Sequence, residues 1–127
     1  MKKSIFLAIC LVCMGLLKIQ AQSLQSTKWK SLFAAPINDT AILTFNSDTS
    51  LIITNSKGME LDRSIFHISK DTVSINDVEG PIACPDGLGF YKFTNSGNFL
   101  KLMIINDPCD GRANSLSGRE WIKVANP

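Results

Sequence analysis

Short apolar runs separated by turn residues recur about every ten residues after residue 22. Within the runs, apolar and polar residues alternate, as Val73, Ser74 and Ile75 do, and a period of two is typical of strands that are buried on one face. The expected strands are Thr27–Ala34, Ala41–Asn46, Leu51–Asn55, Glu60–Ser69, Thr72–Asn76, Gly87–Thr94, Phe99–Ile105 and Glu120–Val124. Helix is scarce in this pattern, and we expect one short helical turn at Cys109–Leu116.

Eight short strands joined by short connections favour an all-β fold. Antiparallel strands of this length can close into an up-and-down barrel, which removes the exposed sheet edges. We therefore predict an eight-stranded antiparallel up-and-down barrel, with a two-sheet sandwich as the alternative. A barrel of this size either fills with its own side chains or holds one small ligand.

Residues 1–22 have the features of a secretory signal peptide. Lys2 and Lys3 precede an apolar run of 13 residues, Ile5–Leu17, and the small residue Ala21 lies near the expected cleavage point. A membrane-spanning helix needs roughly 20 apolar residues, so the run is too short for a stable anchor. We expect an exported protein, periplasmic or secreted, whose folded domain is residues 23–127.

Two cysteines remain after residue 22, Cys84 and Cys109. An even number of cysteines in an exported domain indicates a disulfide. The bridge would close a loop of about 26 residues and stabilise the domain by about 3.5 kcal/mol. A metal site formed with His67 is the alternative, but the cysteine spacing is unlike that of a zinc site, so we expect no metal.

The net charge of the predicted domain is close to zero. Residues 23–127 carry ten Lys and Arg against eleven Asp and Glu, and no long basic run is present. A near-neutral domain has no overall electrostatic attraction to nucleic acid or to anionic lipid. On this ground we expect neither as a partner.

Complete catalytic and cofactor motifs are absent from the sequence. His67, the one histidine, lies on an expected strand with no catalytic partners in its alternation pattern, and we predict a solvent-facing or rim position. Asp107 and Asp110 lie in a Pro/Gly turn, where carboxylates usually accept backbone N–H bonds. No G-x-S-x-G elbow, G-x-G-x-x-G loop or Walker loop occurs, so we expect no cofactor.

Two segments depart from the alternation. Asp77–Gly89 contains three glycines and two prolines around Cys84, and we interpret it as an irregular loop, either a pocket rim or a connection tied down by its disulfide. The six-residue segment Asp107–Arg112 contains a carboxylate at its start and a guanidinium at its end, just before the last expected strand. Arg112 can there close the barrel by packing on an aromatic ring or pairing with a carboxylate, or it can face a ligand.

Trp29 on the first strand and Arg112 before the last strand resemble the arrangement in lipocalin-like, or calycin, barrels. The segment from Cys84 through Asp107–Arg112 to Trp121 also resembles small exported bacterial lipocalin-like domains. The resemblance implies that residues 23–127 form a lipocalin-like barrel in which Arg112 covers Trp29 at the closed end. The structural clamp that it implies consists of Trp29, Asp107 and Arg112.

The resemblance also implies a binding module for a small apolar or amphipathic ligand. The candidate wall residues are Leu43, Phe45, Phe66, Phe90, Tyr91 and Phe93. One alternative is a structural or interaction protein whose barrel is filled. A second is an enzyme that uses the cavity for proton transfer or cyclisation, with Tyr91, Asp107 or Arg112 inside. An apolar cavity favours the binding module, and convergent polar groups in a cavity favour the enzyme.

Overall fold

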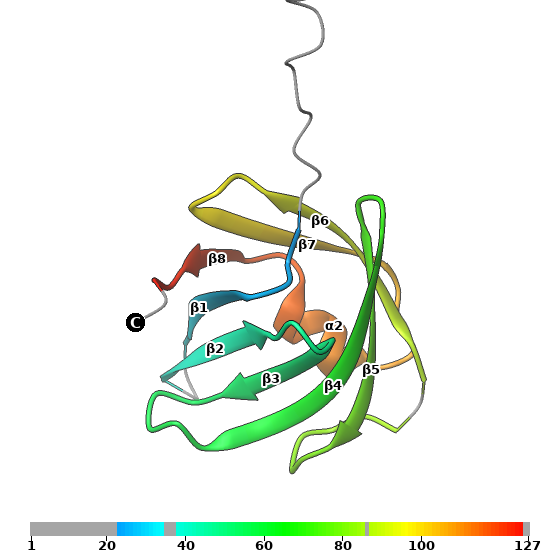
Figure 1. Ribbon diagram of the computed structural model, residues 1–127. Coiled ribbons are helices and arrows are strands. Elements are labelled where there is room, and N and C mark those ends of the chain that lie inside the picture. The colour runs from blue at the N-terminus through cyan, green and yellow to red at the C-terminus, as the bar shows by residue number, and fades with distance from the viewer. Residues whose placement is uncertain (1–22, 35–37, 86, 126–127) are drawn as a thin grey trace, which may run out of the picture.

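Eight antiparallel strands close into a barrel in the computed structural model, which describes residues 23–34, 38–85 and 87–125 (Figure 1). Each strand pairs with the next along the chain, and the last pairs with the first. The strands are β1 (Thr27–Phe33), β2 (Asp39–Phe45), β3 (Ser50–Thr54), β4 (Glu60–Ser69), β5 (Thr72–Glu79), β6 (Gly89–Asn95), β7 (Phe99–Asn106) and β8 (Glu120–Lys123). This confirms the predicted up-and-down barrel over the two-sheet sandwich. The predicted signal peptide, residues 1–22, lies outside the described residues.

The boundaries of two predicted strands need correction. Asp77–Glu79 belong to β5 and not to the irregular loop, because the long strand β4 continues to pair with them across a bulge at Arg63 and Ser64. In contrast, β6 begins at Gly89, not Gly87. Gly87 has a φ of +112°, which a strand residue does not adopt.

The two ends of the barrel differ in their connections. The turns β2–β3, β4–β5 and β6–β7 lie at one end, here called the turn end. They are tight: Ser50 N–H donates to Asp48 Oδ1 at 3.0 Å, and Gly97, with a φ of +95°, donates to Asn95 Oδ1 at 2.9 Å. The longer connections β5–β6 and β7–β8 lie at the other end, here called the loop end, together with β1–β2 and β3–β4.

The β7–β8 connection contains a short helix, α2 (Asp110–Leu116), which covers the loop end. Ala113 and Leu116 are its buried apolar residues, and Leu116 belongs to the main core. The predicted helical turn at Cys109–Leu116 is confirmed, with Cys109 as the residue that precedes the helix.

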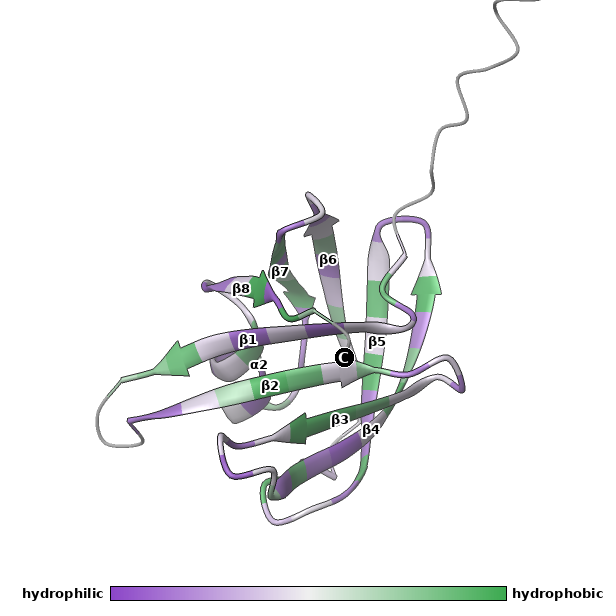
Figure 2. Ribbon diagram, turned by 60° about the vertical axis from the view of Figure 1, so that its left-hand side comes forward, coloured by the Kyte–Doolittle hydropathy of each residue, from purple (hydrophilic) through white to green (hydrophobic). Residues whose placement is uncertain are grey.

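Alternate side chains of the strands point inward and fill most of the barrel. Figure 2 shows the resulting alternation of hydrophobic and hydrophilic residues along the strands. Phe45 and Phe66 meet edge to face with their centroids 5.1 Å apart. At the turn end, Trp29 is fully buried and its indole N–H donates to Thr27 Oγ1 at 2.8 Å. The buried aliphatic and aromatic side chains of the strands are Trp29, Ala41, Leu43, Phe45, Leu51, Phe66, Val73, Ile75, Tyr91, Phe93, Leu100, Leu102 and Trp121.

Candidate functional site

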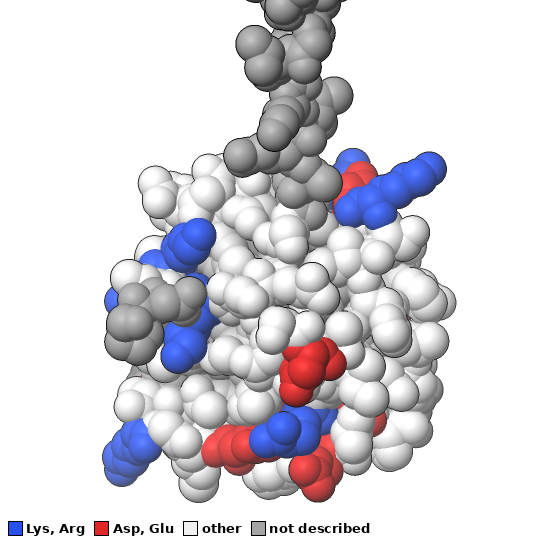
Figure 3. All heavy atoms as spheres, viewed as in Figure 1, with Lys and Arg blue, Asp and Glu red and all other residues white. Residues whose placement is uncertain are grey.

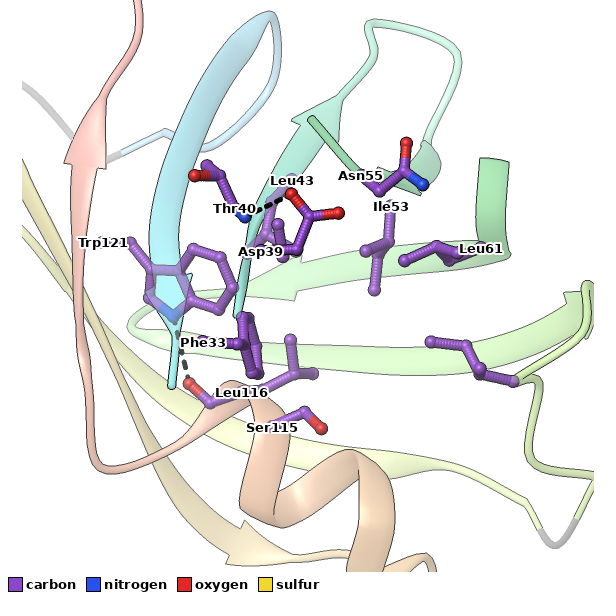
Figure 4. Close-up of a pocket in the computed structure, with 12 residues that line it drawn as sticks. Phe33, Asp39, Thr40, Leu43, Ile53, Asn55, Leu61, Ser115, Leu116 and Trp121 are labelled. Atoms are coloured by element: carbon purple, nitrogen blue, oxygen red, sulfur yellow. Dashed lines mark hydrogen bonds between the residues drawn. The ribbon is translucent and has the colours of Figure 1, made fainter. Parts of the chain in front are cut away.

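A partly open cavity of about 110 Å³ lies at the loop end, between β1–β4, β8 and α2 (Figure 4). Its surface is mostly apolar. The lining residues are Phe33, Asp39, Thr40, Ala41, Leu43, Ile53, Asn55, Leu61, Ile82, Ser115, Leu116 and Trp121.

Two aromatic side chains form one wall of the cavity. Trp121 and Phe33 pack edge to face with centroids 6.2 Å apart. The indole N–H of Trp121 donates to the Leu116 carbonyl at 3.1 Å, so its polar atom is satisfied by α2. The Arg119 guanidinium stacks over the Phe33 ring, 3.7 Å from its centroid. Both rings are therefore held in place, and they present apolar surface to the cavity.

Polar residues stand around the cavity at Asp39, Thr40, Asn55 and Ser115. Most of their hydrogen-bonding capacity serves local structure: Asn55 Oδ1 accepts from the backbone of Lys57 and Met59, and Ser115 Oγ donates to the Gly111 carbonyl. Asp39 accepts from the Thr40 N–H at 2.7 Å. Hydrogen bonds from Ser56 and Thr40 lower the pKa of Asp39, so the cavity has a carboxylate at its edge at neutral pH.

A separate cluster of buried polar groups lies on the β4–β7 side of the barrel, at the same end. Arg112 is its centre. The guanidinium donates to both carboxylate oxygens of Asp107 at 2.7 Å and to the Gly87 carbonyl at 2.7 Å. Its Nη1 lies 3.1 Å from Asp77 Oδ1. The side chain of Arg112 is 6% exposed and that of Asp107 is not exposed, so this is a buried, bidentate ion pair.

Tyr91 completes this group because its hydroxyl donates to Asp107 Oδ2. Burial, with the nearby negative charge of Asp107, raises the pKa of the Tyr91 hydroxyl above its usual range. Burial also opposes ionisation of Asp107. The bonds from Arg112, Tyr91 and the Cys109 N–H outweigh that effect and hold the pKa of Asp107 below its usual value. At neutral pH the group is a neutral phenol, a carboxylate and a guanidinium. The Nη1 of Arg112 is buried and makes its 3.1 Å contact with Asp77 as an ion pair, without a hydrogen bond among the described residues.

Asp62 and Asp77 meet at a single hydroxyl in the same region. Ser64 Oγ lies 2.8 Å from Asp62 Oδ2 and 2.9 Å from Asp77 Oδ1. The hydroxyl has one proton to donate, so the second contact is a hydrogen bond when one carboxyl is protonated. Burial, together with the charge of Asp77, raises the pKa of Asp62 to about 6. Asp62 Oδ1 is buried and has no hydrogen-bond partner among the described residues.

The predicted disulfide Cys84–Cys109 is present and joins the β5–β6 loop to the start of α2. Both ends are held by the buried carboxylates: Cys84 N–H donates to Asp77 Oδ2 at 2.7 Å, and Cys109 N–H donates to Asp107 Oδ1 at 2.8 Å. The disulfide and the Asp77–Arg112 ion pair therefore both connect the region after β5 to α2 and the residue before it. The metal alternative is wrong for these two cysteines. His67 lies exposed on the outer face of β4.

The structure separates the predicted wall residues into two groups. Leu43, Phe45, Phe66, Tyr91 and Phe93 are buried inside the barrel, and of these Leu43 lines the cavity. Phe90 faces outward and is 37% exposed, so its assignment to an inner wall is wrong. Phe90 and Tyr91 are consecutive on β6, and consecutive strand residues point to opposite faces.

The clamp expected from the resemblance differs from the structure. Of the alternatives left open for Arg112, the structure shows pairing with a carboxylate, that of Asp107. Arg112 does not cover Trp29, because its guanidinium is held by Asp77 and Asp107 at the loop end. The cation above the Trp29 ring is Lys123, 5.9 Å from the centroid, which is its neighbour across the β1–β8 pair.

Sequence reasoning missed most of the cavity and half of the polar cluster. Phe33, Trp121 and Leu116 come from β1, β8 and α2, and no local pattern predicts that these segments meet. Asp62, Ser64 and Asp77 did leave a signal. They are polar residues at inward positions of β4 and β5, where the alternation calls for apolar side chains.

No family model, curated protein or solved structure matches this chain significantly. Within the described part of the chain, no group of three or more His, Cys, Asp and Glu side chains is arranged to hold a metal ion. The described helix is too short and too polar to cross a membrane.

Proposed function

We propose that this protein is an exported binding module that takes the apolar part of a small amphipathic molecule into the loop-end cavity. The observation that carries the proposal is the cavity itself, with the fixed aromatic wall of Phe33 and Trp121. Apolar hollows with a few polar groups at the edge are the usual form of small-molecule sites. The resemblance of residues 23–127 to lipocalin-like domains, and the signal-like residues 1–22, support the same reading.

The size of the cavity limits the ligand. An engineered cavity of about 150 Å³ in another protein binds benzene, so a cavity of about 110 Å³ suits a small ring or a short alkyl chain. Burying about six carbons contributes about 5 kcal/mol at about 0.8 kcal/mol each. We therefore expect a dissociation constant on the order of 0.1–1 mM for a six-carbon ligand.

The edge of the cavity selects the polar end of the ligand. Asp39 is ionised at neutral pH and repels an anionic headgroup. A neutral or cationic headgroup meets no such repulsion. The proposed ligand class is thus a short apolar chain or ring with a neutral or cationic polar end.

The two tryptophans provide an internal control for the test. Trp121 lines the cavity, whereas Trp29 is buried at the turn end and bonded to Thr27. Hexanol, hexylamine and hexanoate share one tail and differ in headgroup charge. In a titration followed by NMR, the indole N–H signal of Trp121 should shift and that of Trp29 should not. Hexylamine and hexanol should bind more tightly than hexanoate.

A cavity-filling variant completes the test. Ala41→Leu adds volume at the cavity wall and should abolish the Trp121 shift. Val73→Ile adds volume at a buried position away from the cavity lining and should leave the shift unchanged. If neither indole signal moves at 10 mM ligand, or if both move equally in the unmodified protein, the proposal is wrong and the filled-barrel alternative takes its place.

A further inference from the structure

Closure of the barrel separates the surface charge into two halves. Strands β6, β7, β8 and β1 are neighbours in the closed sheet. Together they carry one carboxylate, Glu120, and five lysines. Four of the lysines point outward, namely Lys28, Lys30, Lys92 and Lys101. Lys123 lies on the inward side of β8, above the Trp29 ring. The outward acidic residues Glu60 and Glu79 lie on β4 and β5, around Arg63. In Figure 3 the basic atoms at the left of the view, beside β1 and β8, have no acidic atoms among them.

The same four strands carry most of the exposed apolar side chains. Of the large apolar residues exposed on the described strands, two lie on β2–β5, namely Ile65 and Val78. The other seven lie on the basic half, and six of them point outward: Leu32, Phe90, Phe99, Met103, Ile105 and Ile122. The seventh, Ile104, lies opposite the buried Tyr91 and so belongs to the inward side of β7. Exposed apolar groups that gather on one face of a soluble domain mark an interaction surface.

The strand register makes this surface continuous. Phe99 lies opposite Ile122, and Ile122 lies opposite Lys30. On the other side of β7, Lys92 lies opposite Met103. We call the outward side chains of β6, β7, β8 and β1 the basic apolar face. Two carboxylates lie close to its lysines. Asp71 is 3.7 Å from Lys92, and Glu120 is opposite Lys101, so the face keeps a positive excess.

A second copy of this chain is a poor match for this face. The acidic half offers opposite charge, but its outer face exposes two large apolar strand residues where that of the basic half exposes six. Two basic apolar faces placed together would bring like charges into contact. A closed barrel also has no free strand edge onto which a partner strand could add.

Nucleic acid is a poor match as well. Interfaces with nucleic acid are strongly polar, and Met103, Ile105 and Ile122 have nothing to offer phosphates. An anionic lipid surface accepts both components. Apolar side chains enter the boundary between headgroups and acyl chains, and lysines lie among the lipid phosphates.

We propose that the basic apolar face docks reversibly on an anionic membrane surface. The near-zero net charge led us to expect no attraction to anionic lipid. That sum hides the separation of basic and acidic side chains onto two halves of the barrel. Docking of this kind is peripheral and requires no membrane-spanning segment. It concerns the outside of the barrel and does not depend on the cavity.

Vesicle binding tests the proposal with matched variants. Vesicles with 30% phosphatidylglycerol in phosphatidylcholine, and vesicles of phosphatidylcholine alone, are sedimented with the full chain at 50 mM and 500 mM salt. The partition onto the anionic vesicles should exceed that onto neutral vesicles and should fall at high salt. All variants carry the same residues 1–22, so the difference in partition between each variant and the unmodified protein reports the folded domain.

The variants compare the two halves of the barrel. Lys101→Gln should lower the partition about fivefold, the factor expected for one lysine at an anionic surface. Ile105→Thr should lower it several-fold because Ile105 is 58% exposed on β7. The controls are Lys57→Gln in the β3–β4 turn and Ile65→Thr on β4, which is 44% exposed. Both should leave the partition unchanged.

Three results would overturn the proposal. The first is equal binding to neutral and anionic vesicles, or no binding to either. The second is a loss in the controls as large as that in Lys101→Gln and Ile105→Thr, with thermal melting confirming that all four variants are folded. The third is self-association or oligonucleotide binding in the absence of vesicles that Ile105→Thr abolishes.

Discussion

Replacing Arg112 by methionine tests whether the buried ion pairs hold the loop end together. The substitution keeps the apolar stem and removes the guanidinium that Asp107 and Asp77 share. The side chains of Arg112, Asp77 and Asp107 are 6%, 3% and 0% exposed, so both carboxylates stay buried without a cation. Removing one partner of a buried pair costs about 3–5 kcal/mol.

A loss of this size is a large part of the stability of a small domain, which is about 5–15 kcal/mol in total. At about 4–5 °C per kcal/mol for a domain of this length, the melting temperature should fall by about 12–25 °C. Urea denaturation at pH 7, followed by tryptophan fluorescence, measures the free energy of unfolding directly. Arg63→Met is the matched control. Arg63 pairs with Glu60 at 2.9 Å, but its side chain is 38% exposed and the pair is screened by solvent, so the expected loss of stability is far smaller than that of Arg112→Met.

The pH dependence of Arg112→Met identifies the cause of its instability. Asp107 has a lowered pKa in the folded protein, so its contribution to stability is present above its unfolded pKa of about 3.9 and is lost as the pH falls through the folded value. Without Arg112, which helps to lower the pKa of Asp107, the Asp107 carboxyl accepts a proton at a higher pH. The stability gap between the two proteins should therefore narrow from pH 7 to pH 3. A gap that does not change with pH, or a loss no larger than that of Arg63→Met, would refute the reasoning.

Three further substitutions probe the neighbouring groups. The stability of Asp62→Asn relative to the unmodified protein should increase by about 2–3 kcal/mol as the pH rises from 4 to 7. The reason is that the pKa of Asp62 is raised to about 6 in the folded protein, so its ionisation destabilises the fold. Parallel plots of unfolding free energy against pH would contradict this. Tyr91→Phe should cost about 1–2 kcal/mol in urea denaturation, since Asp107 keeps its bonds to Arg112, and an unchanged midpoint would show that the phenol bond is dispensable. Replacing Cys84 and Cys109 together by alanine should lower the free energy of unfolding by about 3.5 kcal/mol. Chemical reduction of the unmodified protein should lower it by the same amount. A larger loss on reduction would show that the free thiols themselves destabilise the fold.

The alternation of apolar and polar residues predicted the barrel because each strand carries this pattern within its own sequence. Glu60–Ser69 has the predicted boundaries, and the inward positions of Val73 and Ile75 follow because the residue between them, Ser74, is polar. Alternation shows that neighbours such as Phe90 and Tyr91 point to opposite faces, but it does not show which of the two faces is inner. Phe90 and Tyr91 therefore cannot both line the inside of the barrel, and the predicted set of wall residues was wrong to include both.

The candidate site depends on contacts between distant segments. Asp107 lies in the same short segment as Arg112, for which a carboxylate partner was one of the expected alternatives, whereas Asp77 lies 35 positions away on β5. Asp77 becomes a partner because α2 carries Arg112 across the loop end. The cavity wall of Phe33 and Trp121 likewise joins the first strand to the last. The charge separation has the same origin, because β1 joins β6–β8 on one side of the barrel only when the sheet closes.

The joint between β1 and β8 determines the order in which the chain can assemble. It pairs Trp29 with Lys123 and Lys30 with Ile122, across 94 and 92 sequence positions, while the other strand pairs join neighbours along the chain. Its loop-closure entropy is therefore the largest in the fold, and β8 is the shortest strand. Until β8 has paired with β1, the sheet has two open edges, one of which is β1. A chain that ends before residue 120 would keep both edges exposed, which favours aggregation.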